Sequence, residues 1–205
     1  MTQRLTYRTY LHLDDVLGAA EPLSPRTDYE LWTAERFFIV CHQVSELWIS
    51  QAFADLRLAG CLIDRGELHS PCRLIERASS QVEMATKCLV ELRMLAVTHF
   101  LAFRPKLAGA SGAQSDQFNQ LLQGSKNPLI AELTDSLDRL AGKSAHGDQA
   151  IRVHRHLDEF VRQVARWRRT HLDLVRHFIA GRPGTGGTSG AAYLAAQINA
   201  DGLSH

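Results

Sequence analysis

Helical periodicity is the feature that most constrains the fold of this sequence. Over long stretches the apolar residues recur at alternating steps of three and four, and runs of β-branched residues are few. Residues 148–179 show this best, because their apolar positions share one helical face: Leu157, Phe160, Val164, Trp167, Leu174 and Phe178. The pattern predicts an all-α protein, a helical bundle with long antiparallel helices.

Cap and stop residues set the expected bounds of these helices. Gly60 is a favourable stop for a first helix that begins near Asp28. Ser70 and Pro71 suit the start of a second helix, and Arg104 ends it because a residue before proline is driven out of helical geometry. The expected helices cover residues 28–60, 70–104, 115–124, 128–142 and 148–179.

Composition narrows the class of protein. A chain of 205 residues can bury its own core, so residues 1–205 are expected to form a single domain. The balance of 23 Lys+Arg against 22 Asp+Glu argues against a nucleic-acid binder. No stretch approaches the roughly 20 consecutive apolar residues of a membrane span, and the first residues lack a signal-peptide core. We therefore expect a cytoplasmic protein that binds neither nucleic acid nor membrane.

Two histidines lie on apolar helix faces, where they can serve structure or chemistry. His171 is in register with Trp167 and Leu174, and on spacing alone a hydrogen-bonded structural histidine is more common than a ligand. His42 precedes Glu46 by four residues, which for a single pair is a weak metal signal. A di-iron bundle needs Glu-x-x-His on two helices, and the sequence has none.

Residues 181–190, GRPGTGGTSG, form a Gly-rich loop near the C-terminus. Gly187 stands where a phosphate-binding loop requires lysine, and the loop follows a helix, so a nucleotide site is not favoured. Its backbone N–H groups and the hydroxyl groups of Thr185 and Thr188 can still approach a ligand closely.

Four blocks, kept in order, resemble the tryptophan 2,3-dioxygenase family. They are TYRTYLHLDDVLGAAEPLS, FIVCHQVSELW, FLAFRPKLAGASGAQSDQF with LLQGSKNP, and WRRTHLDLVRHFIAGRPGTGGTSGAAYL. The resemblance implies non-covalent haem b, one per subunit, with His171 as the axial ligand and the opposite face free for dioxygen. It also implies that Trp167 and Gly184 contact the cofactor.

The resemblance implies a site for an aromatic amino acid beside the haem. His42 is expected to meet the indole N–H, as a base or only as a positioning group. Arg104 is expected to grip the carboxylate, and Thr185 in the substrate loop 181–190 to contact the head group. The expected pocket walls are Phe38, Phe100, Tyr7, Tyr10 and Leu11. In the family the N-terminal segment, here residues 1–26, reaches a neighbouring subunit, which implies a homo-oligomer, a tetramer or a dimer.

The implied reaction is insertion of dioxygen across the indole C2–C3 bond of L-tryptophan or a close derivative, giving an N-formylkynurenine. The alternatives are a haem-dependent monooxygenase of a substituted tryptophan or other aromatic amino acid, and a non-catalytic haem sensor. The sequence departs from the family pattern by a shorter stretch between Pro128 and Trp167, and by Ala113 where the family has Phe. Arg8 stands where the family commonly has Gly, and Phe100 stands where it often has Tyr.

Overall fold

The computed structural model describes residues 4–141, 147–179 and 189–199. Within these ranges all regular structure is helical, which confirms the predicted all-α class. The α-helices are α1 Tyr7–Tyr10, α2 Leu13–Gly18, α3 Tyr29–Asp64, α4 His69–Glu91, α5 Val97–Phe103, α6 Asp116–Leu122, α7 Pro128–Ala141, α8 Gly147–Ile179 and α9 Ala191–Asn199. Short 3-10 turns are η1 Leu92–Met94, η2 Arg104–Leu107, η3 Gly112–Gln114 and η4 Gly124–Lys126.

The first long helix, α3, begins as predicted but ends later. The Asp28 side chain accepts a hydrogen bond from the Leu31 backbone N–H at 3.1 Å, which caps the first turn. The expected stop at Gly60 is wrong, because the helix continues to Asp64 and Gly66 follows with φ +80°. Gly60 lies inside the helix, where a Cβ atom would meet the side chain of Leu133 at 3.4 Å, an ordinary van der Waals distance.

The predicted single helix over residues 70–104 is also wrong, because the structure divides it. After α4 and η1, Leu95 and Ala96 are extended, with ψ of 125° and 131°, and α5 then starts in a new direction. Neither residue is a Gly or Pro, so the sequence carries no break signal there. The α-helix does end before Pro105, at Phe103. The expected reason is wrong, because Arg104 keeps helical angles, with φ −48° and ψ −41°, and the chain continues through Pro105 as the 3-10 turn η2.

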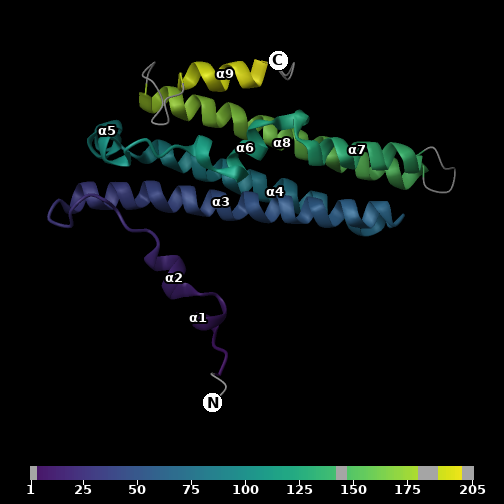
Figure 1. The fold of residues 1–205 in the computed structure, drawn as a ribbon, viewed down its shortest axis with the longest axis horizontal. Helices are drawn as coiled ribbons and strands as arrows, with labels where there is room; N and C mark the ends of the chain where they lie inside the picture. Colours follow the sequence, from purple (N-terminus) through teal and green to yellow (C-terminus); the bar gives the residue numbers. More distant parts are fainter. Residues whose placement is uncertain (1–3, 142–146, 180–188, 200–205) are drawn as a thin grey trace.

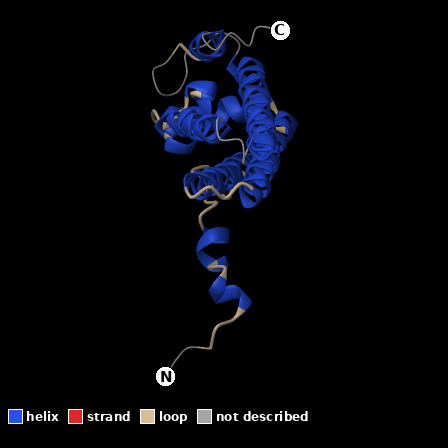
Figure 2. Cartoon of the chain, turned by 90° about the vertical axis from the view of Figure 1, so that its right-hand side faces the viewer, coloured by secondary structure: helices blue, strands red, loops and turns tan. Residues whose placement is uncertain are grey.

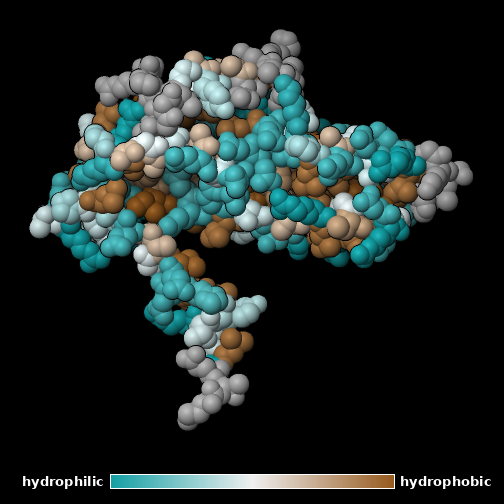
Figure 3. Space-filling view, viewed as in Figure 1, coloured by the Kyte–Doolittle hydropathy of each residue, from teal (hydrophilic) through white to brown (hydrophobic). Residues whose placement is uncertain are grey.

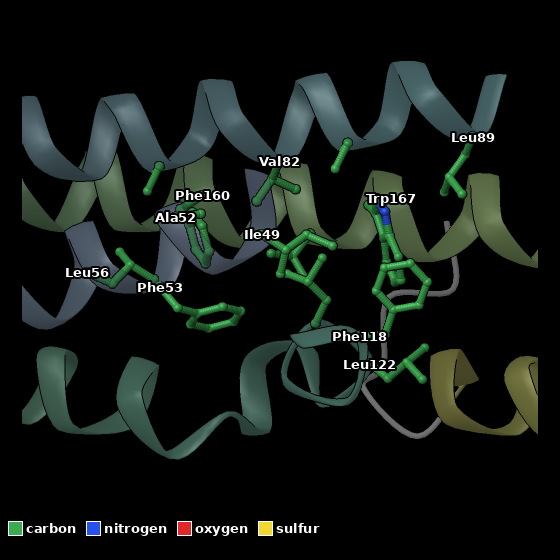
Figure 4. Close-up of a cluster of buried hydrophobic side chains, with 14 of the residues drawn as sticks. Ile49, Ala52, Phe53, Leu56, Val82, Leu89, Phe118, Leu122, Phe160 and Trp167 are labelled. Carbon is green, nitrogen blue, oxygen red and sulfur yellow. The ribbon is translucent and has the colours of Figure 1, made fainter. Parts of the chain in front are cut away.

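The long helices α3, α4 and α8 lie side by side along the molecule, with α7 against α8 and α9 over the C-terminal part of α8 (Figure 1). Their facing side chains form the core, in which Phe53, Leu56 and Phe160 are no more than 1% exposed. Figure 4 shows this cluster between α3, α4 and α8. None of the described helices combines the length and apolar character needed to span a bilayer.

One buried carboxylate connects α3 to α4. Asp55 is 2% exposed, and its oxygens accept hydrogen bonds from Arg77 Nε at 2.7 Å and Arg77 Nη2 at 2.6 Å. Gln51 and Gln81 donate to the same carboxylate at 3.0 and 3.2 Å. The Arg77 hydrogen bonds, opposed by burial, hold the pKa of Asp55 below its usual value.

Residues 4–19, called the arm below, project away from the bundle (Figures 1 and 2). Its apolar side chains are largely uncovered: Leu5 is 72% exposed, Tyr7 77% and Tyr10 67%. Figure 3 shows hydrophobic groups, in brown, among hydrophilic ones on the projecting segment. Within the arm, the guanidinium of Arg8 pairs with Asp14.

The root of the arm is held firmly to α3. The buried carboxylate of Glu35 accepts hydrogen bonds from the backbone N–H groups of Leu23 and Ser24, at 2.9 and 2.8 Å. Gln43 Nε2 donates to the carbonyl of Ala19 at 3.0 Å. The direction in which the arm leaves the bundle is therefore fixed by α3.

Candidate active site

A cavity of about 470 Å³ lies between α3 and α8, bordered also by α5, α6, α9 and the loop around η3. This volume falls in the range of small-molecule and cofactor sites. Five of the residues predicted from the sequence line it together: Phe38, His42, Phe100, Arg104 and His171. They come from α3, α5, η2 and α8, so only the folded bundle brings them to one place.

His42 presents a defined tautomer to the cavity. Its Nδ1 lies 2.8 Å from the backbone carbonyl of Phe38, and because a carbonyl oxygen only accepts, Nδ1 carries the proton. Burial lowers the pKa of His42, although the Phe38 hydrogen bond opposes the shift. At neutral pH the ring is therefore uncharged, with Nε2 as its acceptor.

His171 is held in a different way. Burial lowers the pKa of His171 to about 4, with a smaller contribution from His42. Its Nδ1 is buried and has no hydrogen-bond partner among the described residues. The ring instead stacks on Trp167, with centroids 5.1 Å apart and planes 25° apart, and meets the edge of Phe118 at 6.1 Å. An uncharged imidazole with an available lone pair has the chemistry of a metal ligand.

The remaining wall is aromatic and carries one permanent charge. Phe38 contacts Phe100 and Phe103 with ring centroids 5.8 and 5.3 Å apart, and Phe100 contacts Phe178 at 4.8 Å. Among the described lining residues, Arg104 alone has a side chain that is charged at any ordinary pH. A guanidinium beside aromatic rings suits a ligand with an apolar ring and a carboxylate.

Other predicted residues lie elsewhere. Trp167 is 0% exposed and lies behind His171 instead of lining the cavity. Tyr7, Tyr10 and Leu11 belong to the arm and do not line the cavity of their own chain. Gly184 and Thr185 lie outside the described residues.

The sequence reasoning missed several lining residues, notably Phe118, Val175 and Tyr193. Helical register was a usable signal for Val175, which is one turn after His171 on α8. Phe118 lies in the short helix expected over residues 115–124, and no spacing rule connects that helix to two distant histidines. Two of the departures from the family pattern noted above, Ala113 and Phe100, line the cavity.

Comparisons with known proteins agree on one family. The family model described as tryptophan 2,3-dioxygenase matches residues 1–128. The tryptophan 2,3-dioxygenase of Caulobacter vibrioides is 30% identical, over 97% of this chain and 94% of its own length. That of Paraburkholderia phytofirmans is 29% identical, over 94% and 79%. That of Bordetella pertussis is 28% identical, over 93% and 84%.

The same alignments show that this chain is shorter than the aligned regions of its relatives. They extend over 246 to 254 positions, whereas the chain has 205 residues, so each of these relatives contains segments that are absent here. The shortened stretch expected between Pro128 and Trp167 agrees with this difference. In the structure, α7 and the first part of α8 occupy that stretch.

Proposed function

The chain belongs to the tryptophan 2,3-dioxygenase family, and on that premise we propose that it is a haem-dependent oxygenase of L-tryptophan or a close derivative. The product is an N-formylkynurenine, formed by insertion of both atoms of dioxygen across the indole C2–C3 bond. The observation that carries the proposal is the pairing of two uncharged imidazoles, His42 and His171, with Arg104 in one aromatic cavity.

The residues present fit a haem group. His171 is uncharged and lines the cavity, and its Nδ1 has no hydrogen-bond partner among the described residues. Phe100, Phe178 and Leu174 offer apolar surface for a porphyrin. When bound, haem b supplies the activation of dioxygen, which is the redox chemistry that no side chain of this chain provides.

The side chains determine how the substrate lies. Arg104 binds the carboxylate through a charge-assisted hydrogen-bonded pair, which fixes one end of the amino acid. His42 accepts the indole N–H at Nε2, since its Nδ1 is already engaged by Phe38. Because burial lowers the pKa of His42, the ring is a weak base, and we assign it the positioning role.

Two segments complete the site in this proposal. The apolar side chains of the arm, Tyr7, Tyr10 and Leu11, are exposed and enter the cavity of a neighbouring copy, which makes the protein a homo-oligomer. The Gly-rich loop 181–190 supplies Thr185 to the amino-acid head group and Gly184 beside the haem. Together they exclude water from the indole ring.

A second candidate function is a monooxygenase of a substituted tryptophan. The observation that favours it is Ala113 on the cavity wall, where a small side chain leaves room that the family's phenylalanine would fill. In that case one oxygen atom enters the ring, and the other is reduced to water by two electrons from an external reductant together with two protons.

One experiment separates these functions. The haem-loaded protein is reduced without oxygen, then given dioxygen with L-tryptophan or ring-substituted tryptophans, and product masses are recorded. We expect a gain of two oxygen atoms and an absorbance of the N-formylkynurenine type. A gain of one atom favours the monooxygenase, and no product with any substrate contradicts both oxygenase functions and favours a sensor. The variant Ala113→Phe should reject the larger substrates and keep tryptophan.

A further inference from the structure

Phe118 is the one described aromatic residue in ring contact with both cavity imidazoles. It lies on α6 and is 2% exposed, and its ring centroid is 6.4 Å from that of His42 and 6.1 Å from that of His171. The two histidines come from α3 and α8, so α6 supplies the contact that they share. The Ser115 hydroxyl accepts the Phe118 backbone N–H at 3.0 Å, which fixes the first turn of this short helix.

The two imidazoles depend on Phe118 to different degrees. His42 has a 2.8 Å hydrogen bond to its own helix and a second ring contact, with Phe38 at 4.2 Å. The buried Nδ1 of His171 has no hydrogen-bond partner among the described residues, so the restraints that these residues place on its plane are ring contacts. Histidine ligands of metals are usually oriented by a hydrogen bond at the second nitrogen, and no described residue provides one here.

The rings around His171 form a closed triangle. Trp167 stacks on the imidazole at 5.1 Å, Phe118 meets it at 6.1 Å with planes 65° apart, and Phe118 meets Trp167 at 5.3 Å with planes 69° apart. Figure 4 shows Phe118 lying directly against Trp167. The stacked contact with Trp167 and the edge contact with Phe118 restrain the His171 ring from two directions.

We infer that Phe118 is a positioning residue, which fixes the ring plane of His171 and its separation from His42 on the other side of the cavity. The inference rests on the proposed function in one respect, that His171 is the haem ligand. It adds that the orientation of this ligand is set by aromatic packing from α6, in place of the usual hydrogen bond.

Gly112, in the loop around η3, lies close to Phe118, and a substitution there perturbs the ring more mildly than a substitution of Phe118 itself. A Cβ atom at Gly112 would lie 3.2 Å from Cδ2 of Phe118, a contact tight enough to require a shift of a few tenths of an ångström. The backbone at Gly112 does not have a positive φ, so Gly112→Ala strains this contact and not the chain. The variant therefore displaces the ring without removing it.

The test uses the haem-loaded ferrous protein and the iron–histidine stretching band in resonance Raman spectra. We expect Phe118→Leu to broaden or split this band and to speed haem loss to an acceptor protein by about tenfold or more. Gly112→Ala should change the band in the same way but less. Phe118→Tyr, which keeps the ring, should leave the band as in the wild type. The matched control is Phe160→Leu, since Phe160 is also fully buried and has no ring contact with either histidine.

The outcomes separate positioning from simple core packing. Phe160→Leu should lower the melting temperature as much as Phe118→Leu does, while its iron–histidine band stays as in the wild type. Equal band changes in the two variants, or an unchanged band in both Phe118→Leu and Gly112→Ala, would overturn the inference. Failure to bind haem through His171 would refute it together with the proposed function. A shifted band in a protein that does not oxidise tryptophan would refute the proposed function alone.

Discussion

The two halves of the bundle treat buried polar groups in opposite ways. In one half, around Phe53 and Phe160, the buried carboxylate of Asp55 accepts hydrogen bonds from Arg77, Gln51 and Gln81. In the other half, around the cavity, the buried Nδ1 of His171 has no partner among the described residues. Asp55 therefore stays charged in the first half, and His171 is uncharged in the second.

This difference shows how one bundle provides both stability and chemistry. Donors that compensate burial keep the pKa of Asp55 low, so its charge connects α3 to α4. Burial without compensation keeps the pKa of His171 at about 4, so its lone pair is available at neutral pH. We expect substitutions in the cavity half to change ligand binding, and substitutions around Asp55 to change the free energy of unfolding.

The largest effect is expected from His171→Ala, which removes the proposed haem ligand. The haem content of the purified protein should fall to nearly zero, measured by the Soret absorbance per chain. Helix content by circular dichroism should stay as in the wild type, because no described residue forms a hydrogen bond with the imidazole Nδ1. The control is His154→Ala on the same helix, whose ring lies 3.0 Å from Asp138 and away from the cavity lining. Full haem content in His171→Ala would contradict the comparison.

The second-largest effect is expected from Arg104→Met, which removes the permanent charge of the cavity wall. Hydrogen bonds to charged groups contribute about 1.5–3 kcal/mol, so the dissociation constant for tryptophan should rise by about 100-fold. Haem content should not change. The matched control is Arg57→Met on α3, where an exposed guanidinium bonds Gln120 at 3.2 Å. Unaltered tryptophan affinity in Arg104→Met, measured by spectral titration, would refute the assigned carboxylate contact.

In the other half, Asp55→Asn should lower the free energy of unfolding by about 2 kcal/mol, because charge-assisted hydrogen bonds in a buried place are lost. Urea unfolding measures this change. Haem content and tryptophan affinity should remain as in the wild type. Asp64→Asn is the control, since Asp64 at the end of α3 is exposed and accepts one hydrogen bond, from Ser136 at 2.9 Å. Loss of tryptophan affinity in Asp55→Asn would show that the two halves are coupled.

Asp55 also predicts part of the acid sensitivity. Its pKa is lower in the folded chain than in the unfolded chain, so the unfolded chain binds more protons between these two values. The stabilisation is complete above the unfolded pKa, near 3.9, and is lost as the pH falls through the folded value. Urea unfolding at a series of pH values should show a shallower acid decline in Asp55→Asn than in the wild type. Parallel curves would assign the acid sensitivity to other groups.

The smallest effect is expected at Ala108, next to the cavity loop. This residue adopts φ +48° and ψ +38°, the left-handed region, which costs a residue with a Cβ atom about 1 kcal/mol. Ala108→Gly relieves this strain but adds freedom to the unfolded chain, so the net gain in unfolding free energy should be about 0.5 kcal/mol. Differential scanning calorimetry can measure it. A loss of stability would mean that the Ala108 side chain makes contacts that outweigh the strain.

Much of the fold could be predicted because its signals are local. The apolar face of residues 148–179 identified α8, Ser115 identified the start of α6, and Pro128 is the first residue of α7 as expected. The errors came where packing outweighs local preference. Gly60 has the chemistry of a helix end, yet α3 continues past it to Asp64. The extended residues Leu95 and Ala96 have ordinary helix-forming side chains.

The candidate site, like the fold, could be predicted only in part. Register placed His171 on an inward face, and family resemblance supplied its proposed role together with those of His42 and Arg104. The contact of Phe118 with both imidazoles had no sequence signal, because α3, α6 and α8 are far apart along the chain.

By itself the sequence determined the helical class, most helix starts and the residue types that chemistry requires, since these depend on periodicity and on neighbours within a few residues. The tertiary structure alone decided which side chains share a cavity and which ring restrains His171. It also decided that Asp55 meets hydrogen-bond donors and stays charged, and that His171 is uncharged. These properties depend on the partners that meet each group across the bundle, and helices distant in sequence supply most of those partners.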